Sequence, residues 1–397
     1  MAVEVGTGVE AVIGLEVHAQ LLTTSKMFCS CSAAYLAGEP NSHTCPVCLG
    51  LPGALPVANG QAIEYTIRTA LALNCEIPEH SKFDRKNYFY PDLPKGFQIS
   101  QYDLPLSRDG HLEIEVDGAT RRVGITRVHL EEDTGKLVHS GDINVSTSSL
   151  VNLNRCGVPL MEIVSEPDMR TAAEAREYMQ RLRQVLVWIG VNDGNLEEGS
   201  LRCDANVSVR PVGQQELGVK VEVKNMNSFR AVFLALEHEI ERQQAALSNG
   251  EAILQETRGW NEAKGVTVGQ RSKEFAHDYR YFPEPDLPPL TVSRATVDRI
   301  RGDLPELPAA RAQRFRDQLG LSAYDAAQLT STAELAGYFE EVVAAVGAAN
   351  AKEAANWVVG DVNRVLKEGE GITALSVRPG GLASLIARKL DGTVSNN

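Results

Sequence analysis

Residues 11–21 read AVIGLEVHAQL, and apolar and polar side chains alternate along this stretch. Glu16, His18 and Gln20 share one parity, and the other parity is apolar. Such alternation predicts a half-buried β-strand, because successive side chains leave a pleated sheet on opposite faces. A carboxylate and an imidazole about 6–7 Å apart along one strand can share a divalent metal or a proton. The alternative is an ordinary solvated face of an antiparallel sheet.

The same pattern returns in three later stretches, residues 125–133, 200–210 and 218–224. Their polar parities hold Arg127, His129, Glu131 and Asp133, then Arg202, Asp204 and Asn206, then Lys220, Glu222 and Lys224. A merely solvated face usually carries interchangeable Lys, Glu and Thr, whereas these rows hold groups that fix geometry. Carboxylates with an imidazole suit Mg²⁺, and the basic residues suit phosphate charge. These rows therefore predict a phosphoryl-transfer site built on a sheet face.

The remaining pattern predicts an α+β fold followed by an all-helical domain. Residues 112–116 and 121–126 read as a hairpin around Asp117-Gly118, and 150–154 and 160–164 as further strands. Helices are expected over 60–74 and over 171–189, the second opened by a capping box at Thr171. Short helices then follow at 305–319, 322–329, 332–346, 351–367 and 379–390. We therefore expect two domains, residues 1–293 and 294–397.

Four of the seven cysteines form two close pairs, Cys29 with Cys31 and Cys45 with Cys48, separated by thirteen residues. This spacing suits a tetrahedral zinc site, and four protein ligands leave no position for water, so the role would be structural. His43 is a further possible ligand. The alternative is a set of buried free cysteines. An odd cysteine count with a metal-like cluster favours a reducing cytoplasm over a disulfide framework.

Composition excludes several classes of protein. The formal charge of −13 argues against nonspecific nucleic-acid binding, but leaves room for a local basic surface. No apolar run approaches a membrane span, and the first residues lack the features of a secretory signal. Neither the motif GxxxxGK[ST] nor the motif GxGxxG occurs, which disfavours a P-loop fold and a dinucleotide-binding fold. Residues 82–102, rich in Lys, Arg and Tyr, form either a cationic stacking surface or a loop anchored by its aromatics.

Six stretches resemble the B subunits of the GatCAB tRNA-dependent amidotransferases: GLEVH (14–18), RKNYFYPD (85–92), HLEED (129–133), NRCGVPLMEIVSEPD (154–168), GSLRCDANVS (199–208) and EVKNMNSFR (222–230). The resemblance runs in order from about residue 12 to 290 and continues to the end. It implies a cradle of antiparallel sheet related to the catalytic fold of glutamine synthetase. It also implies that the chain stops before the small tail domain of the family.

The resemblance implies a glutamine-dependent carbon–nitrogen ligase that uses ATP and Mg²⁺. The carboxylate of Glu on tRNA(Gln), or of Asp on tRNA(Asn), would be phosphorylated and then amidated. Ammonia would come through a channel from the GatA glutaminase, with GatC as a third member of the assembly. The resemblance implies roles for seven residues. The metal ligands or bases would be Glu16, His18, Glu131 and Glu132, and of these Glu16, His18 and Glu132 would bind Mg²⁺. Lys86 would bind phosphate, and Arg202 and Asp204 would lie at the nucleotide. Residues 275–286 resemble the closing strand of the cradle.

Two other functions remain open at this point. A non-catalytic tRNA-binding zinc scaffold would use the polar rows to contact RNA, but carboxylates repel phosphate unless a metal intervenes. A free-standing carboxylate–amine ligase would make a small amide from free ammonia. No GxSxG nucleophile motif occurs, which fits both an ammonia-using ligase and a chain fed by a partner. The long helical domain favours the partner-fed, tRNA-directed function.

Overall fold

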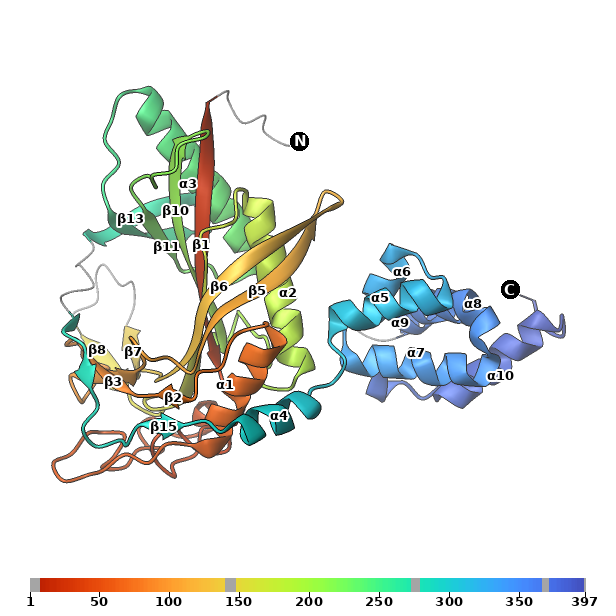
Figure 1. Ribbon diagram of the computed structural model, residues 1–397, viewed down its shortest axis with the longest axis horizontal. Coiled ribbons are helices and arrows are strands. Elements are labelled where there is room, and N and C mark those ends of the chain that lie inside the picture. Colours follow the sequence, from red (N-terminus) through yellow and green to blue (C-terminus); the bar gives the residue numbers. More distant parts are fainter. Residues whose placement is uncertain (1–7, 140–147, 273–278, 366–370, 396–397) are drawn as a thin grey trace. The chain divides into compact units, whose positions relative to one another are not determined.

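The protein is described by a computed structural model over residues 8–139, 148–272, 279–365 and 371–395 (Figure 1). The chain divides into two compact units, Met1–Asp303 and Leu304–Asn397. Helix α4 (Arg294–Gly302) lies in the first unit and packs on α1 (Gly60–Ala72). Val297 and Ile300 of α4 are buried there. This division therefore differs from the expected boundary at 293/294 by the length of α4.

The core of the first unit is a sheet with the strand order β13-β12-β11-β10-β1-β9-β6-β5. Neighbouring strands are antiparallel except β11 and β12. The strands are β1 (Val9–Gln20), β5 (Ser107–Val116), β6 (Ala119–Glu132), β9 (Pro159–Ser165), β10 (Leu201–Pro211), β11 (Val221–Lys224), β12 (Glu256–Asn261) and β13 (Val266–Ser272). The predicted strand at 11–21 is confirmed, and β1 lies in the middle of the sheet.

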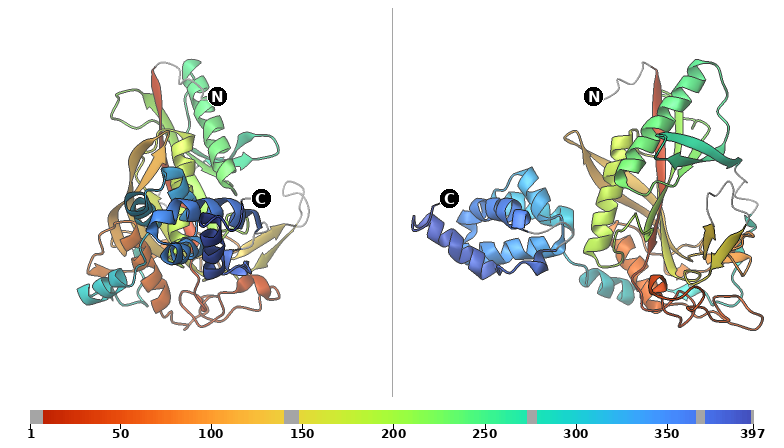
Figure 2. Two further views of the ribbon diagram at one scale, coloured as in Figure 1. Left: turned by 90° about the vertical axis from the view of Figure 1, so that its right-hand side faces the viewer. Right: turned by 180° about the vertical axis from the view of Figure 1, so that it is seen from behind.

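Helices cover the apolar face of this sheet. Leu15, Val17 and Ala19 of β1 are at most 1% exposed. Helices α1, α2 (Ala172–Trp188) and α3 (Phe229–Ser248) contact the sheet, and the view from behind shows α2 and α3 lying across it (Figure 2). The Thr171 hydroxyl caps α2 as the sequence predicts, accepting a bond from the Glu174 amide. The polar parity of β1 is thereby left on the opposite face.

The β5–β6 hairpin contains a bulge that changes which residues face the helices. Its turn is Asp117-Gly118, both with positive φ, as its sequence predicts. Further along β6, the register with β9 shifts by one residue between Ile125 and Arg127. Ile125 is buried before the shift and Val128 after it. The alternation expected over 125–133 is therefore interrupted at its start, because the extra residue inverts the parity.

Among the described residues, three small sheets lie outside the main one. The first has the strand order β14 (Phe282–Pro283), β3 (Asp84–Asn87), β4 (Phe97–Ser100). The second pairs β15 (Leu290–Thr291) with β2 (His80–Ser81), and the third pairs β7 (Lys136–His139) with β8 (Ser149–Asn152). The strand predicted at 150–154 thus pairs with β7 rather than joining the main sheet. Of the predicted closing strand at 275–286, residues 275–278 lie outside the described residues, and Phe282–Pro283 pairs with β3.

The second unit is helical, as predicted. It contains α5 (Pro308–Leu319), α6 (Ala323–Leu329), α7 (Ala333–Val346), α8 (Ala351–Asn356), a π-helical turn (Trp357–Val362), α9 (Asn363–Val365) and α10 (Pro379–Leu390). Phe315 and Phe339 pack edge to face at 5.1 Å in its core. The helix expected over 351–367 is therefore interrupted, and its last residues lie outside the described ranges. Across the described residues, no helix combines the length and apolarity that crossing a membrane requires.

A buried carboxylate joins α3 to the edge of the main sheet. Glu239 of α3 is fully buried and accepts bonds from Arg242 at 2.6 Å and from the Thr267 hydroxyl of β13 at 2.8 Å. Burial raises the pKa of Glu239, but the hydrogen bonds from Arg242, Gln243 and Thr267 outweigh it, so the pKa lies below its ordinary value. The ionised form is therefore the one that stabilises the fold.

We expect Glu239→Gln to lower the free energy of unfolding by about 3 kcal/mol at neutral pH, because its guanidinium partners lose their counter-charge. A carboxyl group whose pKa is lower in the folded than in the unfolded chain stabilises the fold at pH values above its unfolded pKa of about 4.3. This contribution is lost as the pH falls through the folded pKa. Denaturant unfolding at pH 7 and pH 3 measures this, with the exposed neighbour Glu241→Gln as control. An equal loss at both pH values would contradict the charge argument.

Candidate active site

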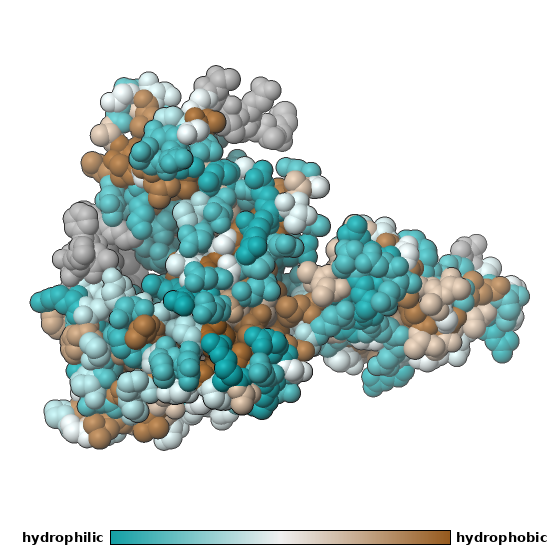
Figure 3. All heavy atoms as spheres, in the orientation of Figure 1, coloured by the Kyte–Doolittle hydropathy of each residue, from teal (hydrophilic) through white to brown (hydrophobic). Residues whose placement is uncertain are grey.

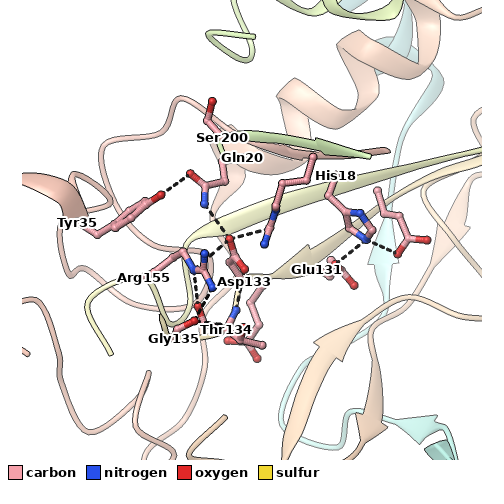
Figure 4. A network of polar contacts seen from close by, with 12 residues as sticks. His18, Gln20, Tyr35, Glu131, Asp133, Thr134, Gly135, Arg155 and Ser200 are labelled. Carbon is pink, nitrogen blue, oxygen red and sulfur yellow. Dashed lines mark hydrogen bonds and ion pairs between the residues drawn. The ribbon is translucent and has the colours of Figure 1, made fainter. Parts of the chain in front are cut away.

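A row of polar side chains crosses the middle of the main sheet. His18 of β1 lies opposite Arg202 of β10 on one side and Glu162 of β9 on the other, and Glu162 lies opposite His129 of β6. Opposed residues on adjacent strands share a face, so these four side chains form one row. Glu131, two residues after His129, lies on the same face. Figure 4 shows His18 and Glu131 pointing toward one another.

His18, Glu131 and Glu162 form a cluster that can hold a metal ion. Their ligand atoms all lie within 4.8 Å of one another. The Nε2 atom of His18 is 3.9 Å from Glu131 and 3.6 Å from Glu162, and His129 Nε2 is 3.4 Å from Glu162. Both carboxylates are buried. Two carboxylates and an imidazole that converge in this way suit a divalent cation that keeps open positions for substrate.

The pKa values of this cluster show that its charges depend on one another. Burial lowers the pKa of His18, but Glu162 and Glu131 more than compensate and raise it to about 9. Burial and the charge of Glu162 raise the pKa of Glu131 to about 7. Burial lowers the pKa of His129 to about 3, which leaves that imidazole neutral at physiological pH. A bound metal would take the place of the proton on His18, because a ligating imidazole must be neutral.

The other face residues predicted from the sequence surround this cluster. Glu16 lies two residues before His18, opposite Asp204, and accepts a bond from Asn206 at 2.7 Å. Asp204 pairs with Lys224 of β11. Arg202 donates to Asp133 at 2.8 Å. Asp133 also accepts from Gln20 at 2.8 Å and lies beside Arg155 (Figure 4). Arg202 and Asp204 are therefore held in ion pairs at the border of the site.

Glu132 lies apart from the cluster. Adjacent residues of a strand point to opposite faces, so Glu132 turns away from Glu131. It pairs with Lys95, accepts a bond from the Ile99 amide at 3.0 Å and lines a cavity of about 220 Å³ beside Cys48. The structure thus brings Glu162, rather than Glu132, to His18. The signal in the sequence was available: Glu162 is the one charged residue in the apolar strand at 160–164.

Lys86 reaches the cluster from β3 in the small sheet. Burial lowers its pKa, but the charges of Glu131 and Glu162 and the nearby tyrosines outweigh burial and raise it above the ordinary value. Its Nζ atom lies 5.1 Å from the centre of the Tyr279 ring, and no hydrogen bond or ion pair joins it to a described residue. Lys86 is therefore a half-buried ammonium available to a ligand.

The four predicted cysteines come together in the segment after β1. The Sγ atoms of Cys29, Cys31, Cys45 and Cys48 all lie within 4.8 Å of one another, and His43 is not part of the group. The Cys45 amide donates to Cys48 Sγ at 3.1 Å. The cluster can therefore bind a metal through four thiolates.

A buried lysine adds to this cluster. Lys26 is 1% exposed, and its Nζ atom lies 3.8 Å from Cys48 Sγ. The hydrogen bond with Cys29, and to a smaller degree the Lys26 charge, lower the pKa of Cys48 to about 5. A thiolate is thus favoured before any metal binds, which fits the donor set of a cationic metal.

The cysteine segment has little core of its own. Of residues 29–57 only Cys48 is buried, and Leu36, Leu51, Leu55 and Val57 are exposed by 49% or more. Figure 3 shows a mainly hydrophilic surface with hydrophobic patches along the lower edge of the first unit, where this segment runs. Because packing supplies little stability here, a metal would be the main constraint on the conformation of the segment.

Comparison with known proteins assigns a family to this arrangement. Residues 11–298 match the family described as the GatB/GatE catalytic domain. The B subunit of the aspartyl/glutamyl-tRNA(Asn/Gln) amidotransferase of Carboxydothermus hydrogenoformans is 58% identical over 387 residues, covering 97% of this chain and 80% of the relative. Its counterpart from Dehalococcoides mccartyi strain CBDB1 is 58% identical, and the match covers 98% of this chain and 81% of the relative. The B subunit from Trichormus variabilis is 55% identical, and the match covers 100% of this chain and 82% of the relative.

For the cysteine cluster, we expect Cys48→Ser to lower both the metal content and the melting temperature, because one of four thiolate ligands is lost. Elemental analysis of the purified protein reads the metal directly. Cys75→Ala, a buried cysteine outside the cluster, is the matched control and should keep a full metal complement. Full occupancy in Cys48→Ser would exclude the four-cysteine site.

For the sheet-face cluster, we expect Glu162→Gln to weaken binding of Mn²⁺ by at least about tenfold, since even groups behind the ligands matter that much. Mn²⁺ is used in place of Mg²⁺ because its paramagnetic resonance signal reports free ion. Glu115→Gln, an exposed glutamate of β5 in the same sheet, should bind Mn²⁺ like the unmodified protein. Equal affinity in Glu162→Gln would remove Glu162 from the ligand set.

Proposed function

This chain belongs to the family of aspartyl/glutamyl-tRNA(Asn/Gln) amidotransferase B subunits, and we propose that it carries out the activating half-reaction of that enzyme. It uses ATP to phosphorylate the side-chain carboxylate of Glu-tRNA(Gln) or Asp-tRNA(Asn), and ammonia then displaces the phosphate to give the amide. The observation that carries this proposal is the convergence of His18, Glu131 and Glu162 beneath an unpaired ammonium, Lys86.

The chemistry explains why such a site is needed. A carboxylate oxygen is a poor leaving group, so ammonia cannot displace it directly. When that oxygen attacks the γ-phosphorus of ATP, the bond to the β,γ-bridging oxygen breaks, and ADP leaves with the electron pair. Ammonia then attacks the acyl carbon, the carbon–oxygen bond breaks, and hydrogen phosphate leaves with one ammonia proton. Bound Mg²⁺ would neutralise phosphate charge in the first step.

The residues of this chain divide the remaining tasks. His18, Glu131 and Glu162 are the groups that would hold Mg²⁺, and Glu16, beside them on β1, is available for a second contact. Lys86 would bind phosphate oxygen as a point charge. His129 is neutral, because burial lowers its pKa, and so it can hydrogen-bond within the site without adding charge. Glu132 would act only indirectly, by holding the end of β6 in place through its contacts with Lys95 and Ile99.

We further propose that the sheet is a cradle like that of glutamine synthetase and that the four cysteines bind zinc structurally. An antiparallel sheet with a polar face opposite its helices supports the first, and four clustered thiols support the second. The relatives are named as B subunits, which supports assembly with further chains. We take these to be a GatA glutaminase supplying ammonia through a channel, and GatC. A cluster of reduced cysteines supports a cytoplasmic location.

The first test is release of ADP by the chain assembled with its partner subunits, given ATP, Mg²⁺ and ammonium chloride. We expect ADP only when Glu-tRNA(Gln) or Asp-tRNA(Asn) is present, together with amide on the tRNA. Glu16→Gln should reduce the rate by about 100-fold or more, because the metal that would stabilise charge at the reacting phosphate loses a carboxylate contact. Glu115→Gln is the control.

Two results would replace this function by another. Equal ADP release with free glutamate or aspartate would identify a small-substrate ligase. Binding of the tRNA with no ADP release under any condition would identify a non-catalytic scaffold.

A further inference from the structure

The bulge in β6 aims one arginine onto the active-site face. Before the register shift, odd-numbered residues such as Ile125 face the helices, and after it even-numbered residues such as Val128 do. Without the extra residue, Arg127 would point into the helix layer. Bulges re-aim side chains in this way and are common beside active sites. The bulge therefore places Arg127 on the same face as His129 and Glu131.

Unlike Arg202, Arg155 and Lys224, Arg127 has no counter-charge among the residues that the structure describes. Arg202 and Arg155 lie against Asp133, and Lys224 pairs with Asp204. The guanidinium of Arg127 makes no hydrogen bond or ion pair with any residue that the structure describes, and its Nε atom is buried without a partner. A buried, unsatisfied donor of this kind is costly, so it indicates a ligand.

Neither residue directly opposite Arg127 is a carboxylate, because Arg108 of β5 lies on one side and Val164 of β9 on the other. Arg127 lies opposite Val164 of β9, and Val164 lies opposite Glu16 of β1. Two strand spacings of about 4.8 Å thus separate Arg127 from Glu16, with an apolar side chain between them. The adjacent row along the strands holds His18, Glu162 and His129. A small anion over Val164 would therefore have Arg127 on one side and the metal cluster beside it.

Lys86 approaches the same place from the small sheet. The charges of Lys86 and Arg127 both act on the pKa of His129, and both act on the pKa of the Tyr281 hydroxyl, which places the two cations around one region of the site. Lys86 offers a point charge, whereas a guanidinium offers donors in a planar fork that matches phosphate oxygens. The two groups complement each other.

We propose that Arg127 binds the phosphoryl group during its transfer from ATP to the substrate carboxylate. This inference rests on the proposed function and adds a residue to it. In the transfer described above, charge spreads over the equatorial oxygens of the γ-phosphorus as one P–O bond forms and the bond to ADP breaks. Arg127 donates to those oxygens, so that its effect is larger in the transition state than in the ATP complex.

The experiment measures kcat and KM for ATP in the assembled enzyme with Arg127→Ala and Arg127→Lys. Removing one preorganised donor costs about 100- to 1,000-fold in kcat, so we expect that loss for Arg127→Ala with little change in KM. Arg127→Lys should retain part of the activity, because it keeps the charge but not the fork. The control is Arg122→Ala, an exposed arginine of the same strand on the far side of the bulge.

A second measurement separates binding of phosphate from a structural role. Added guanidinium ion should restore part of the kcat of Arg127→Ala and leave the control variant unaffected. Loss of activity with a lowered melting temperature and no rescue would assign Arg127 to folding and overturn the proposal. Unchanged kcat in both Arg127 variants would overturn it as well.

The unmodified enzyme distinguishes failure of this inference from failure of the proposed function. If it releases ADP with misacylated tRNA while the Arg127 variants behave normally, only the role of Arg127 is wrong. If the unmodified enzyme itself releases no ADP with that tRNA, the activating function is wrong, and the role of Arg127 falls with it.

Discussion

The burial of charge at the centre of the main sheet is the constraint on which the site depends. Glu131, Glu162 and His18 sit on strands whose other face is packed against helices, and both carboxylates are buried. Burying isolated charges is expensive, so the fold must compensate each of them. Burial and the neighbouring charges shift the pKa values of these groups, raising that of His18 to about 9 and that of Glu131 to about 7. A site with such buried charges is suited to a metal cation and anionic substrates.

Two irregular features make that arrangement possible. The bulge in β6 turns Arg127, His129 and Glu131 onto the polar face while Val128 and Leu130 stay in the core. The small sheet carrying β3 brings Lys86 over the same face from a distant part of the chain. The regular strands supply carboxylates and cations that are already paired, such as Arg202 with Asp133 and Lys224 with Asp204. The irregularities add the cations that phosphate chemistry requires.

The cysteine segment shows a different solution to a shortage of packing. Its side chains are mostly exposed, and a metal bound by the four thiol groups that meet within 4.8 Å would fix its conformation. Lys26, buried beside Cys48, lowers the cost of holding thiolate charge there. Glu132 and Lys95 line the cavity beside Cys48, so the second carboxylate of the Glu131-Glu132 pair lies apart from the cluster of His18, Glu131 and Glu162.

The sequence by itself determined the elements whose signals are local. Alternation predicted β1 and the β10–β11 pair, the Asp-Gly turn predicted the β5–β6 hairpin, and cysteine spacing predicted the metal-binding group. The family resemblance proposed Glu16, His18, Glu131 and Lys86 as site residues, and the structure brings His18 and Glu131 together in one cluster. Only the tertiary structure decided that Glu162 joins His18, that Glu132 pairs with Lys95, and that a bulge in β6 precedes Arg127. These depend on strand order and on one extra residue in β6, and neither the partner of a strand nor a register shift is encoded in the periodicity of the strand itself.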